Sequence, residues 1–513
     1  ALIRTLSNCG VDICFTNPGT SEMHFVAALD AVPDVRAVLA LFEGVATGAA
    51  DGYARVAGRP AATLLHLGPG MGNGWANLHN ARRGHVPVVN IVGDHATYHR
   101  KYDAPLTSDI DGLARAVSGW VRSSDSSDAL PDDTADAVAA AQGPPGQVAT
   151  LILPADSSWS EARGPAEPRP VAVPPPLDDA LLNRAADALR AGGSSALLVG
   201  GRVVGSEVGL VAATRLAAGT GSKLLAETFP TRLRRGGGLP AIERLGYLAE
   251  FAQMQLEGVT RLIVIDTTAP VSFFAYPGRP SDLVPEGCEV IRFEPDGNDP
   301  VAILDALADR VGAPVDVPRQ EAVRPDLGSG ALTAETLANA LGALLPADAI
   351  VSDESNTSGL SMAGATAGCP PHDWLTLTGG AIGQGLPVAT GAALAAPDRP
   401  VIALESDGSA LYTIQSLWTQ ARERSNVTTI LLNNRSYSIL NLELSRVGAE
   451  EPGPVALSML DLSNPEMDFV SIARGLGVAG SKATTVAEFA DQFTSALETA
   501  GPHLIQVDLE PLF

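Results

Sequence analysis

The chain has 513 residues, of which 45% are hydrophobic and 18% are charged, and its formal net charge at pH 7 is −24. This length predicts about three domains, and the composition is ordinary for globular domains with large cores. The negative charge, with a pI near 4.6, argues against nucleic acid and anionic membrane surfaces as partners.

The cysteines and the apolar segments indicate a cytoplasmic protein. The four cysteines lack metal-ligand or redox spacing, so we expect reduced structural thiols. They are Cys9, Cys14, Cys288 and Cys369. No apolar run is long enough to span a membrane, and no signal peptide is recognisable.

The first third of the chain alternates between short apolar strands and helices. The predicted strands are residues 11–16, 35–41, 61–65 and 87–92, and the predicted helices are residues 22–29, 45–53 and 74–82. This alternation predicts a doubly wound parallel sheet. Ligands of such sheets bind at the carboxyl ends of the strands, so the residues that follow the strands are candidates for a site.

Three of these strand ends carry candidate residues. After the first strand, Asn17-Pro18-Gly19 predicts a sharp turn into a helix capped by Thr20 or Ser21, and turn chemistry alone explains it. Glu43 ends the next strand among apolar neighbours, although a glutamate there is usually an exposed helix-start residue. His66 ends the strand 61–65, where a single histidine is more often structural than catalytic.

Two proline-rich segments divide the chain. The segment 164–178 reads G-P-A-E-P-R-P-V-A-V-P-P-P-L-D, and a second segment spans about residues 312–329. Such segments do not form regular secondary structure, so we interpret them as linkers. The predicted domains are residues 1–165, 178–312 and 330–513.

The middle domain carries the glycine-rich sequence L-L-V-G-G-R-V-V-G at residues 197–205. Gly200 and Gly205 are compatible with a dinucleotide-binding turn. However, Arg202 stands where the fingerprint requires glycine. We therefore favour an ordinary strand-to-helix turn.

Two polar segments open the C-terminal domain. D-E-S-N-T-S, residues 353–358, follows the predicted strand 349–351, and T-G-G-A-I-G-Q-G-L-P spans residues 378–387. Taken separately, they are a polar turn and a glycine-rich loop.

The segment 401–437 predicts a metal site. Asp407 follows the buried strand 401–404, and Asn434 follows the strand 427–432. Both strand ends lie on the same edge of a parallel sheet, so the two side chains can meet there. With a backbone carbonyl near Ser436 they supply three oxygens of the octahedral set that Mg²⁺ prefers. Gly408 lets the backbone approach a phosphate, and a helix beginning near Ser409 offers N–H groups to it.

These motifs resemble those of thiamine-diphosphate enzymes. Their cofactor signature is G-D-G followed, after roughly thirty residues, by N-N, and here Ser406 replaces the first glycine. The sequences N-P-G, E-G-x-A-x-G-x-A-D-G-Y-A-R and L-H-x-x-x-G are similar to the pyrimidine-binding domain of the 2-oxo-acid decarboxylase and acetohydroxyacid synthase superfamily. Within it, the likeness to benzoylformate decarboxylases is greatest.

The resemblance implies three doubly wound α/β domains (pyrimidine-binding, middle and diphosphate-binding) with thiamine diphosphate and Mg²⁺ as cofactors. It implies Asp407, Asn434 and the Ser436 carbonyl as metal ligands. Glu43 would share a proton with the aminopyrimidine ring, the Gly380 carbonyl would receive its amino group, and Ile382 would wedge beneath the cofactor. The other expected cofactor contacts are Asn17, Pro18, Gly19, Asn356, Thr357, Gly408, Ser409 and Tyr437. Some relatives hold FAD in the middle domain, and we expect none here.

The chain matches neither subfamily completely. His66 has a counterpart in benzoylformate decarboxylases but not in acetohydroxyacid synthases. Benzoylformate decarboxylases also use a histidine from the middle domain, whereas the matching segment here, P-V-S-F-F-A-Y-P-G, offers Phe274 or Ala275.

The sequence therefore predicts an enzyme that decarboxylates a 2-oxo acid, with an aldehyde or acyloin product and Glu43 and His66 as catalytic residues. The alternatives are an acetolactate-synthase-like transferase and a cofactor-binding paralogue that has lost catalysis, which the retention of Glu43 disfavours. The family's half-sites meet between subunits, so a homodimer or a dimer of dimers is expected.

Overall fold

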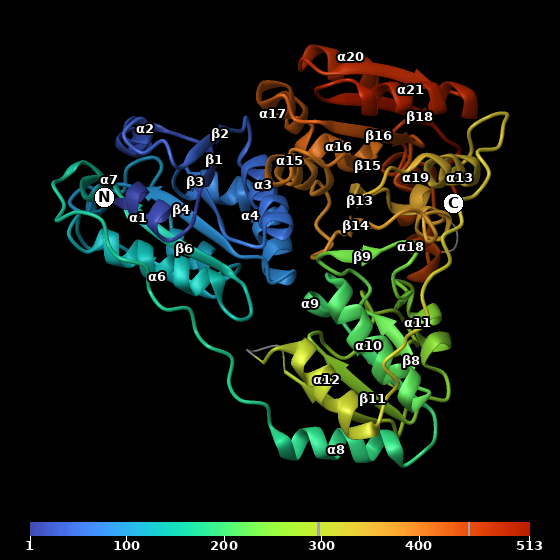
Figure 1. Cartoon of the computed structure of the whole chain (residues 1–513). Helices are drawn as coiled ribbons and strands as arrows, with labels where there is room; N and C mark the ends of the chain where they lie inside the picture. Colours follow the sequence, from blue (N-terminus) through green and yellow to red (C-terminus); the bar gives the residue numbers. More distant parts are fainter. Residues whose placement is uncertain (295–297, 450–451, 513) are drawn as a thin grey trace.

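A computed structural model describes residues 1–294, 298–449 and 452–512 and contains three sheets, each covered by helices (Figure 1). The α/β class with parallel sheets is confirmed. Paired strands run parallel throughout the described residues, except that β9 and β14 are antiparallel.

The N-terminal sheet has the strand order β2-β1-β3-β4-β6-β5. Its strands are β1 (Ile13–Asn17), β2 (Arg36–Leu39), β3 (Ala61–Leu65), β4 (Val88–Asp94), β5 (Trp120–Ser123) and β6 (Val148–Pro154). Its helices are α1 (Leu2–Asn8), η1 (Thr20–Glu22), α2 (Met23–Leu29), α3 (Glu43–Ala57), α4 (Leu67–Arg83), η2 (Arg100–Tyr102), α5 (Ile110–Arg115), α6 (Leu130–Gln142) and α7 (Ala155–Trp159). From β1 the chain crosses to β2 on one side and later to β3 on the other, so β1 and β3 flank the topological switch point.

The helices α3 and α4 are longer than the sequence predicted: α3 continues to Ala57, beyond the predicted end at residue 53, and α4 extends mainly at its start. Helix α4 begins at Leu67 rather than near Gly74, and glycines and Pro69 in its first turns hide that start from propensity arguments. Buried packing overrides the weak propensity there, because α4 lies close against α3.

The middle sheet has the order β10-β8-β7-β11-β12. Its strands are β7 (Ser195–Val199), β8 (Lys223–Ala226), β10 (Glu243–Arg244), β11 (Arg261–Ile265) and β12 (Glu289–Phe293). Its helices are α8 (Asp179–Arg190), α9 (Gly201–Val204), α10 (Glu207–Thr220), α11 (Ala249–Leu256) and α12 (Pro300–Val311). The switch point here lies between β7 and β11.

The C-terminal sheet has the order β17-β18-β16-β15-β13-β14-β9. Its strands are β9 (Leu233–Arg235), β13 (Ile350–Glu354), β14 (His372–Leu375), β15 (Val401–Ser406), β16 (Val427–Asn433), β17 (Ala479–Ala483) and β18 (His503–Asp508). Its helices are α13 (Ala334–Leu344), η3 (Asn356–Gly359), α14 (Met362–Ala365), α15 (Gly385–Ala395), α16 (Asp407–Thr413), α17 (Ser416–Glu423), α18 (Ser438–Arg446), α19 (Pro454–Ser458), α20 (Phe469–Gly475) and α21 (Val486–Glu498). Strand β9 comes from the middle segment of the chain, so one strand crosses between the predicted domains. The switch point of the C-terminal sheet lies between β13 and β15.

The N-terminal and C-terminal sheets are joined by the packing of α3 against α15, which lie side by side in Figure 1. A Cβ on Gly52 would lie 2.1 Å from the Val388 carbonyl oxygen, and one on Gly391 would lie 1.9 Å from the Ala49 carbonyl oxygen. Only glycine fits where the two backbones approach so closely. The glycines of the E-G-x-A-x-G-x-A-D-G motif, such as Gly48 and Gly52, therefore lie on the face of α3 that packs against α15.

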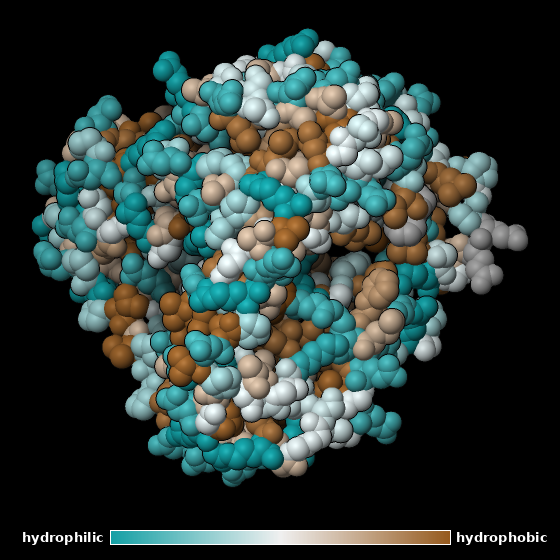
Figure 2. Space-filling view, turned by 45° about the vertical axis from the view of Figure 1, so that its right-hand side comes forward, coloured by the Kyte–Doolittle hydropathy of each residue, from teal (hydrophilic) through white to brown (hydrophobic). Residues whose placement is uncertain are grey.

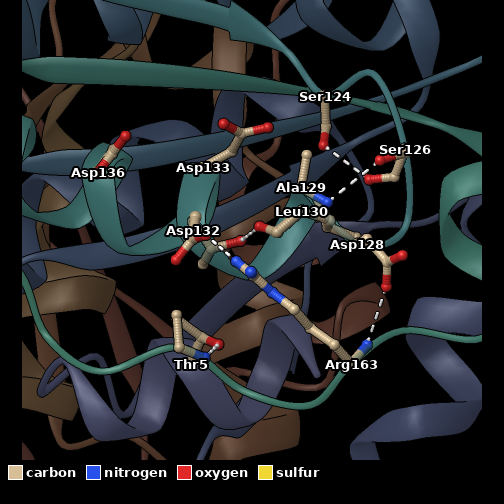
Figure 3. Close-up of polar contacts among 12 residues, drawn as sticks. Thr5, Ser124, Ser126, Asp128, Ala129, Leu130, Asp132, Asp133, Asp136 and Arg163 are labelled. Carbon is tan, nitrogen blue, oxygen red and sulfur yellow. Dashed lines mark hydrogen bonds and ion pairs between the residues drawn. The ribbon is translucent and has the colours of Figure 1, made fainter.

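The first linker begins as a segment bound to the N-terminal domain. Figure 3 shows Arg163 beside Asp132 of α6, with its backbone N–H donating to Asp128 at 3.1 Å. The N–H of Ala166 donates to Thr5 at 3.0 Å, and Arg169 also pairs with Asp132. Helix and strand are absent from residues 164–178, all of which the structure describes. Among the described residues, no helix combines the length and apolar character needed to cross a bilayer.

Candidate active site

The first group of predicted site residues lies at the switch point of the N-terminal sheet. Asn17 ends β1, and His66 follows β3; the register pairs Asn17 with Leu65, so the two strand ends are adjacent. A Cβ on Gly19 would lie 2.2 Å from the His66 ring. The Asn17-Pro18-Gly19 turn therefore packs directly on His66, which explains the glycine.

Glu22 is a residue of this site that the sequence analysis did not select. Its side chain is fully buried, and Oε2 lies 2.8 Å from His66 Nδ1 and accepts the Gly19 N–H at 2.8 Å. Oε1 accepts the Ser21 hydroxyl at 2.6 Å. An ionised carboxylate can only accept, so beside ionised Glu22 the Nδ1 of His66 is the donor and Nε2 is the second nitrogen. The expected cap from Thr20 or Ser21 is replaced by this glutamate.

Glu43 is the first residue of α3 and is 8% exposed. Its Oε2 accepts the Asn73 amide N–H at 3.0 Å. A Cβ on Gly70 would lie 3.2 Å from Glu43 Oε1 and 3.4 Å from His66 Cβ. Glu43 and His66 therefore lie on two sides of Gly70, and Asn73 is a second residue that pattern analysis missed.

The second group lies at the carboxyl ends of β15 and β16. Asp407 is buried at the start of α16, and its two oxygens accept the N–H groups of Gly408 at 2.8 Å and Arg435 at 2.6 Å. Asn434 Oδ1 accepts the Ser436 N–H at 3.0 Å. The structure thus brings the three predicted metal ligands to one place. The ring of Tyr437 packs on Gly408, where a Cβ would lie 2.4 Å from its Cε1.

The Asp407 side chain fits a bound cation. Within residues 1–294, 298–449 and 452–512 it forms no ion pair, although it is 2% exposed. Desolvation by burial raises the pKa of Asp407 above its usual value. A buried carboxylate without an ion-pair partner is costly, and a divalent cation coordinated by oxygen ligands would lower that cost.

The remaining predicted contacts border the same edge of the sheet. Strand β13 runs through Glu354, further than predicted, and η3 follows it with Asn356 and Thr357. Asn356 donates to the hydroxyl groups of Ser406 at 3.2 Å and Ser409 at 3.0 Å. Its φ of 49° is a left-handed conformation that asparagine tolerates.

The loop 376–384 carries Gly380 and Ile382 and is held against the N-terminal domain. Asn80 of α4 donates to the Ala381 carbonyl at 2.8 Å, and Arg55 of α3 donates to the Thr376 carbonyl at 2.8 Å. Phe273 covers the other side, since a Cβ on Gly380 would lie 2.6 Å from its ring. Phe273 belongs to an aromatic cluster in which neighbouring ring centroids lie 4.9 to 6.0 Å apart: Phe229, Tyr247, Phe273 and Phe274.

Within the part of the chain that the structure describes, no hydrogen bond joins the first group of side chains (Asn17, Glu22, Glu43 and His66) to the second (Asn356, Asp407 and Asn434). The predicted site residues of one chain therefore form two groups, which we call the first and the second half-site.

Comparison with known proteins agrees with this geometry. The model of the thiamine pyrophosphate enzyme N-terminal TPP binding domain matches residues 1–114, and that of the C-terminal TPP binding domain matches residues 358–507. The chain belongs to the thiamine-diphosphate-dependent enzymes, in the group that contains decarboxylases and acetolactate synthases.

Two curated relatives and one solved structure illustrate that group. The chain is 58% identical to "Putative acetolactate synthase large subunit IlvX" of Mycobacterium tuberculosis, over 99% of this chain and 98% of the relative. It is 30% identical to the benzoylformate decarboxylase of Pseudomonas aeruginosa, over 100% of this chain and 98% of that protein. The 4-hydroxybenzoylformate decarboxylase of Rhodococcus jostii RHA1 has a TM-score of 0.84 and 27% identity, with 99% of this chain and 98% of that chain covered.

Proposed function

We propose that the protein uses thiamine diphosphate and Mg²⁺ to decarboxylate a 2-oxo acid, with an aldehyde or an acyloin as product. The observation that carries the proposal is the pairing of His66 with buried Glu22 beside Glu43. Bound thiamine diphosphate supplies a carbon nucleophile and stores the electron pair that remains when CO₂ leaves. The protein supplies orientation and proton handling.

Two side chains handle protons. Asn73 holds one oxygen of Glu43, so the carboxyl group is oriented to share a proton with a ring nitrogen of the aminopyrimidine. Glu22 holds Nδ1 of His66, so Nε2 is the nitrogen that can give or take a proton beside the substrate. Histidine titrates near neutral pH, which suits protonation of a decarboxylated product.

A transferase of the acetolactate synthase type is the second candidate. The relative at 58% identity carries that name. Phe274 or Ala275 stands where benzoylformate decarboxylases place a second histidine, and neither side chain is a proton donor. Phe274 packs against Phe273, whose ring lies beside Gly380. With one donor missing, protonation slows while attack on a second carbonyl compound is unhindered.

Product analysis separates the candidates. The purified protein, supplied with thiamine diphosphate and Mg²⁺, is incubated with pyruvate or benzoylformate, alone and with an added aldehyde. Free aldehyde or acyloin supports the first proposal, and acetolactate as sole product supports the transferase. Bound cofactor without turnover of any substrate indicates the non-catalytic paralogue.

We expect His66→Ala to depress 2-oxo-acid conversion by about 10²–10⁴-fold, the usual contribution of a general acid. Ligation that starts from an aldehyde should fall less, because no carboxylate leaves in that reaction. Both rates are measured by product chromatography. His24→Ala is the matched control, since His24 is an exposed histidine that packs on Trp159. A wild-type protein that yields only aldehyde at high aldehyde concentration would contradict the single-donor argument.

We infer that the middle domain holds no FAD, because its switch point already contains the chain's own carboxylates. Glu227 accepts the Gly201 N–H at 2.8 Å, and Asp266 accepts the Arg202 N–H at 2.7 Å. These N–H groups at the start of α9 are those that would bind a phosphate. Burial raises the pKa of Glu227 to about 7, and a phosphate would displace or repel both side chains.

We expect the active form to be at least a dimer, since no hydrogen bond joins the two half-sites of one chain and the family joins such half-sites between subunits. Large apolar side chains remain exposed near the second half-site: Leu360, Tyr412, Phe274 and Met459. Figure 2 shows hydrophobic residues scattered over the face formed by the middle and C-terminal domains. Light scattering combined with size-exclusion chromatography gives the mass. A monomer that turns over substrate would contradict the expectation.

A further inference from the structure

Two glutamates stand side by side in the core of the C-terminal sheet, at its switch point. Glu354 ends β13, Glu405 lies in β15, and the strand register pairs them. Their exposures are 2% and 1%. Burial of a carboxyl group is costly unless it is bonded, so such a pair needs a structural or functional reason.

Glu354 binds the end of the loop 376–384. Its Oε1 accepts the Gly383 N–H at 2.6 Å, and its Oε2 accepts the Gly385 N–H at 2.5 Å. Gly385 is the first residue of α15, so Glu354 caps that helix from a neighbouring strand. Charge-assisted bonds of this length are the strong class of hydrogen bond. The loop that they hold carries Gly380 and Ile382.

The same residue also contacts the diphosphate side of the site. Burial raises the pKa of Glu354 to about 7, and a hydrogen bond from the Ser409 hydroxyl opposes this rise. The Ser406 hydroxyl donates to the Glu354 carbonyl at 3.1 Å. Asn356, two residues further on, donates to both of these serines. The carboxyl group of Glu354 thus binds the loop 376–384. Its backbone carbonyl and its side chain bind the Ser406–Ser409 turn.

Glu405 lies against the same backbone but makes a different contact there, with the backbone N–H of Leu386 in α15. A Cβ on Gly385 would lie 2.2 Å from Glu405 Oε2 and 3.0 Å from Glu354 Oε2, so both carboxyl groups converge there. The N–H groups of Gly383 and Gly385 donate to Glu354 and not to Glu405. Glu405 is therefore a neighbour of similar burial that lacks the bonds to the loop, and it provides a matched control.

We propose that Glu354 is a positioning residue that fixes the loop 376–384 relative to the Ser406–Ser409 turn, and so sets the distance between the groups that hold the pyrimidine and the diphosphate of one cofactor. The inference rests on the proposed function, since it requires that the loop and the turn bind two parts of the same molecule.

The test is Glu354→Gln, compared with Glu405→Gln. Glutamine has one acceptor oxygen, so it can bind only one of the two N–H groups and turns its own NH₂ toward the other. At saturating thiamine diphosphate and Mg²⁺, hydrogen–deuterium exchange at the cofactor C2 should slow about 10²-fold, the effect of a misplacement near 1 Å. Glu405→Gln should exchange at the wild-type rate.

Two further measurements separate positioning from folding and from cofactor affinity. Amide hydrogen exchange of the apo protein over residues 378–386 should rise in Glu354→Gln and stay unchanged in Glu405→Gln. The dissociation constant of thiamine diphosphate should change less than the C2 exchange rate. If Glu354→Gln does not fold, Glu354→Asp keeps the charge but is one methylene too short to reach both N–H groups, and the same effects are expected.

If the Glu354→Gln protein exchanges the C2 hydrogen at the wild-type rate at saturating cofactor, the inference is overturned. Unchanged amide exchange over residues 378–386 in this variant would overturn it as well. A wild-type protein that binds the cofactor but shows no C2 exchange would instead overturn the proposed function. In that case the amide exchange still decides whether Glu354 holds the loop.

Discussion

Purified Asp407→Ala protein is expected to retain no thiamine diphosphate. Asp407 is the one anionic side chain among the three predicted metal ligands, the others being the Asn434 amide oxygen and the Ser436 carbonyl. Mg²⁺ requires hard oxygen ligands and holds a diphosphate by bridging it to the protein. Without the carboxylate, the metal and with it the diphosphate lose their anchor.

The measurement is the cofactor content of protein purified in excess thiamine diphosphate and Mg²⁺, together with calorimetric titration. Asp398→Ala is the matched control, because Asp398 is an exposed aspartate before the amino end of the same strand, β15. Asp407→Asn separates charge from loop structure, since an amide oxygen still accepts an N–H from Gly408 or Arg435. Stoichiometric cofactor in Asp407→Ala would refute the metal assignment, as would full cofactor retention by wild-type protein after chelation.

The ends of the strands could be predicted because they follow from the local pattern of apolar residues in the sequence. The apolar runs before Asp407 and Asn434 mark two buried strands, and parallel neighbours necessarily end on one edge. The same reasoning placed Asn17 and His66 together at β1 and β3. What these site residues do chemically stays a prediction.

The burial of Glu22 and Glu405 could not be predicted, because it depends on packing between distant segments. Glu22 has the sequence context of a helix-start residue, yet Gly93 of β4 leaves room for it, and a Cβ there would lie 1.6 Å from Glu22 Oε1. Glu405 interrupts an apolar strand and faces Glu354 only through the β13–β15 register. Strand β9 is three residues long and gives no periodic signal, so its pairing with β14 was also invisible.

Glu43→Gln is expected to bind thiamine diphosphate nearly as well as the wild type but to exchange the C2 hydrogen about 10²–10⁴-fold more slowly, the range of general acid–base contributions. The predicted ligands of the diphosphate and metal lie in the other half-site, so we expect the affinity to be preserved. Glutamine keeps the shape of the side chain and an acceptor for the Asn73 N–H. It cannot share a titratable proton with the pyrimidine ring, so the amino group opposite C2 is not converted into a base.

The exchange rate is measured at saturating cofactor by quenched flow with detection by proton NMR, so that any change in affinity is removed. Asn73→Ala is the companion variant, because it keeps the carboxyl group but removes the N–H that orients Oε2. Its exchange should slow less than that of Glu43→Gln, since orientation is loosened while the proton remains available. A Glu43→Gln protein that exchanges C2 hydrogen at the wild-type rate would exclude Glu43 from the proton transfer and leave the Glu22–His66 pair as the proton-handling group of this half-site.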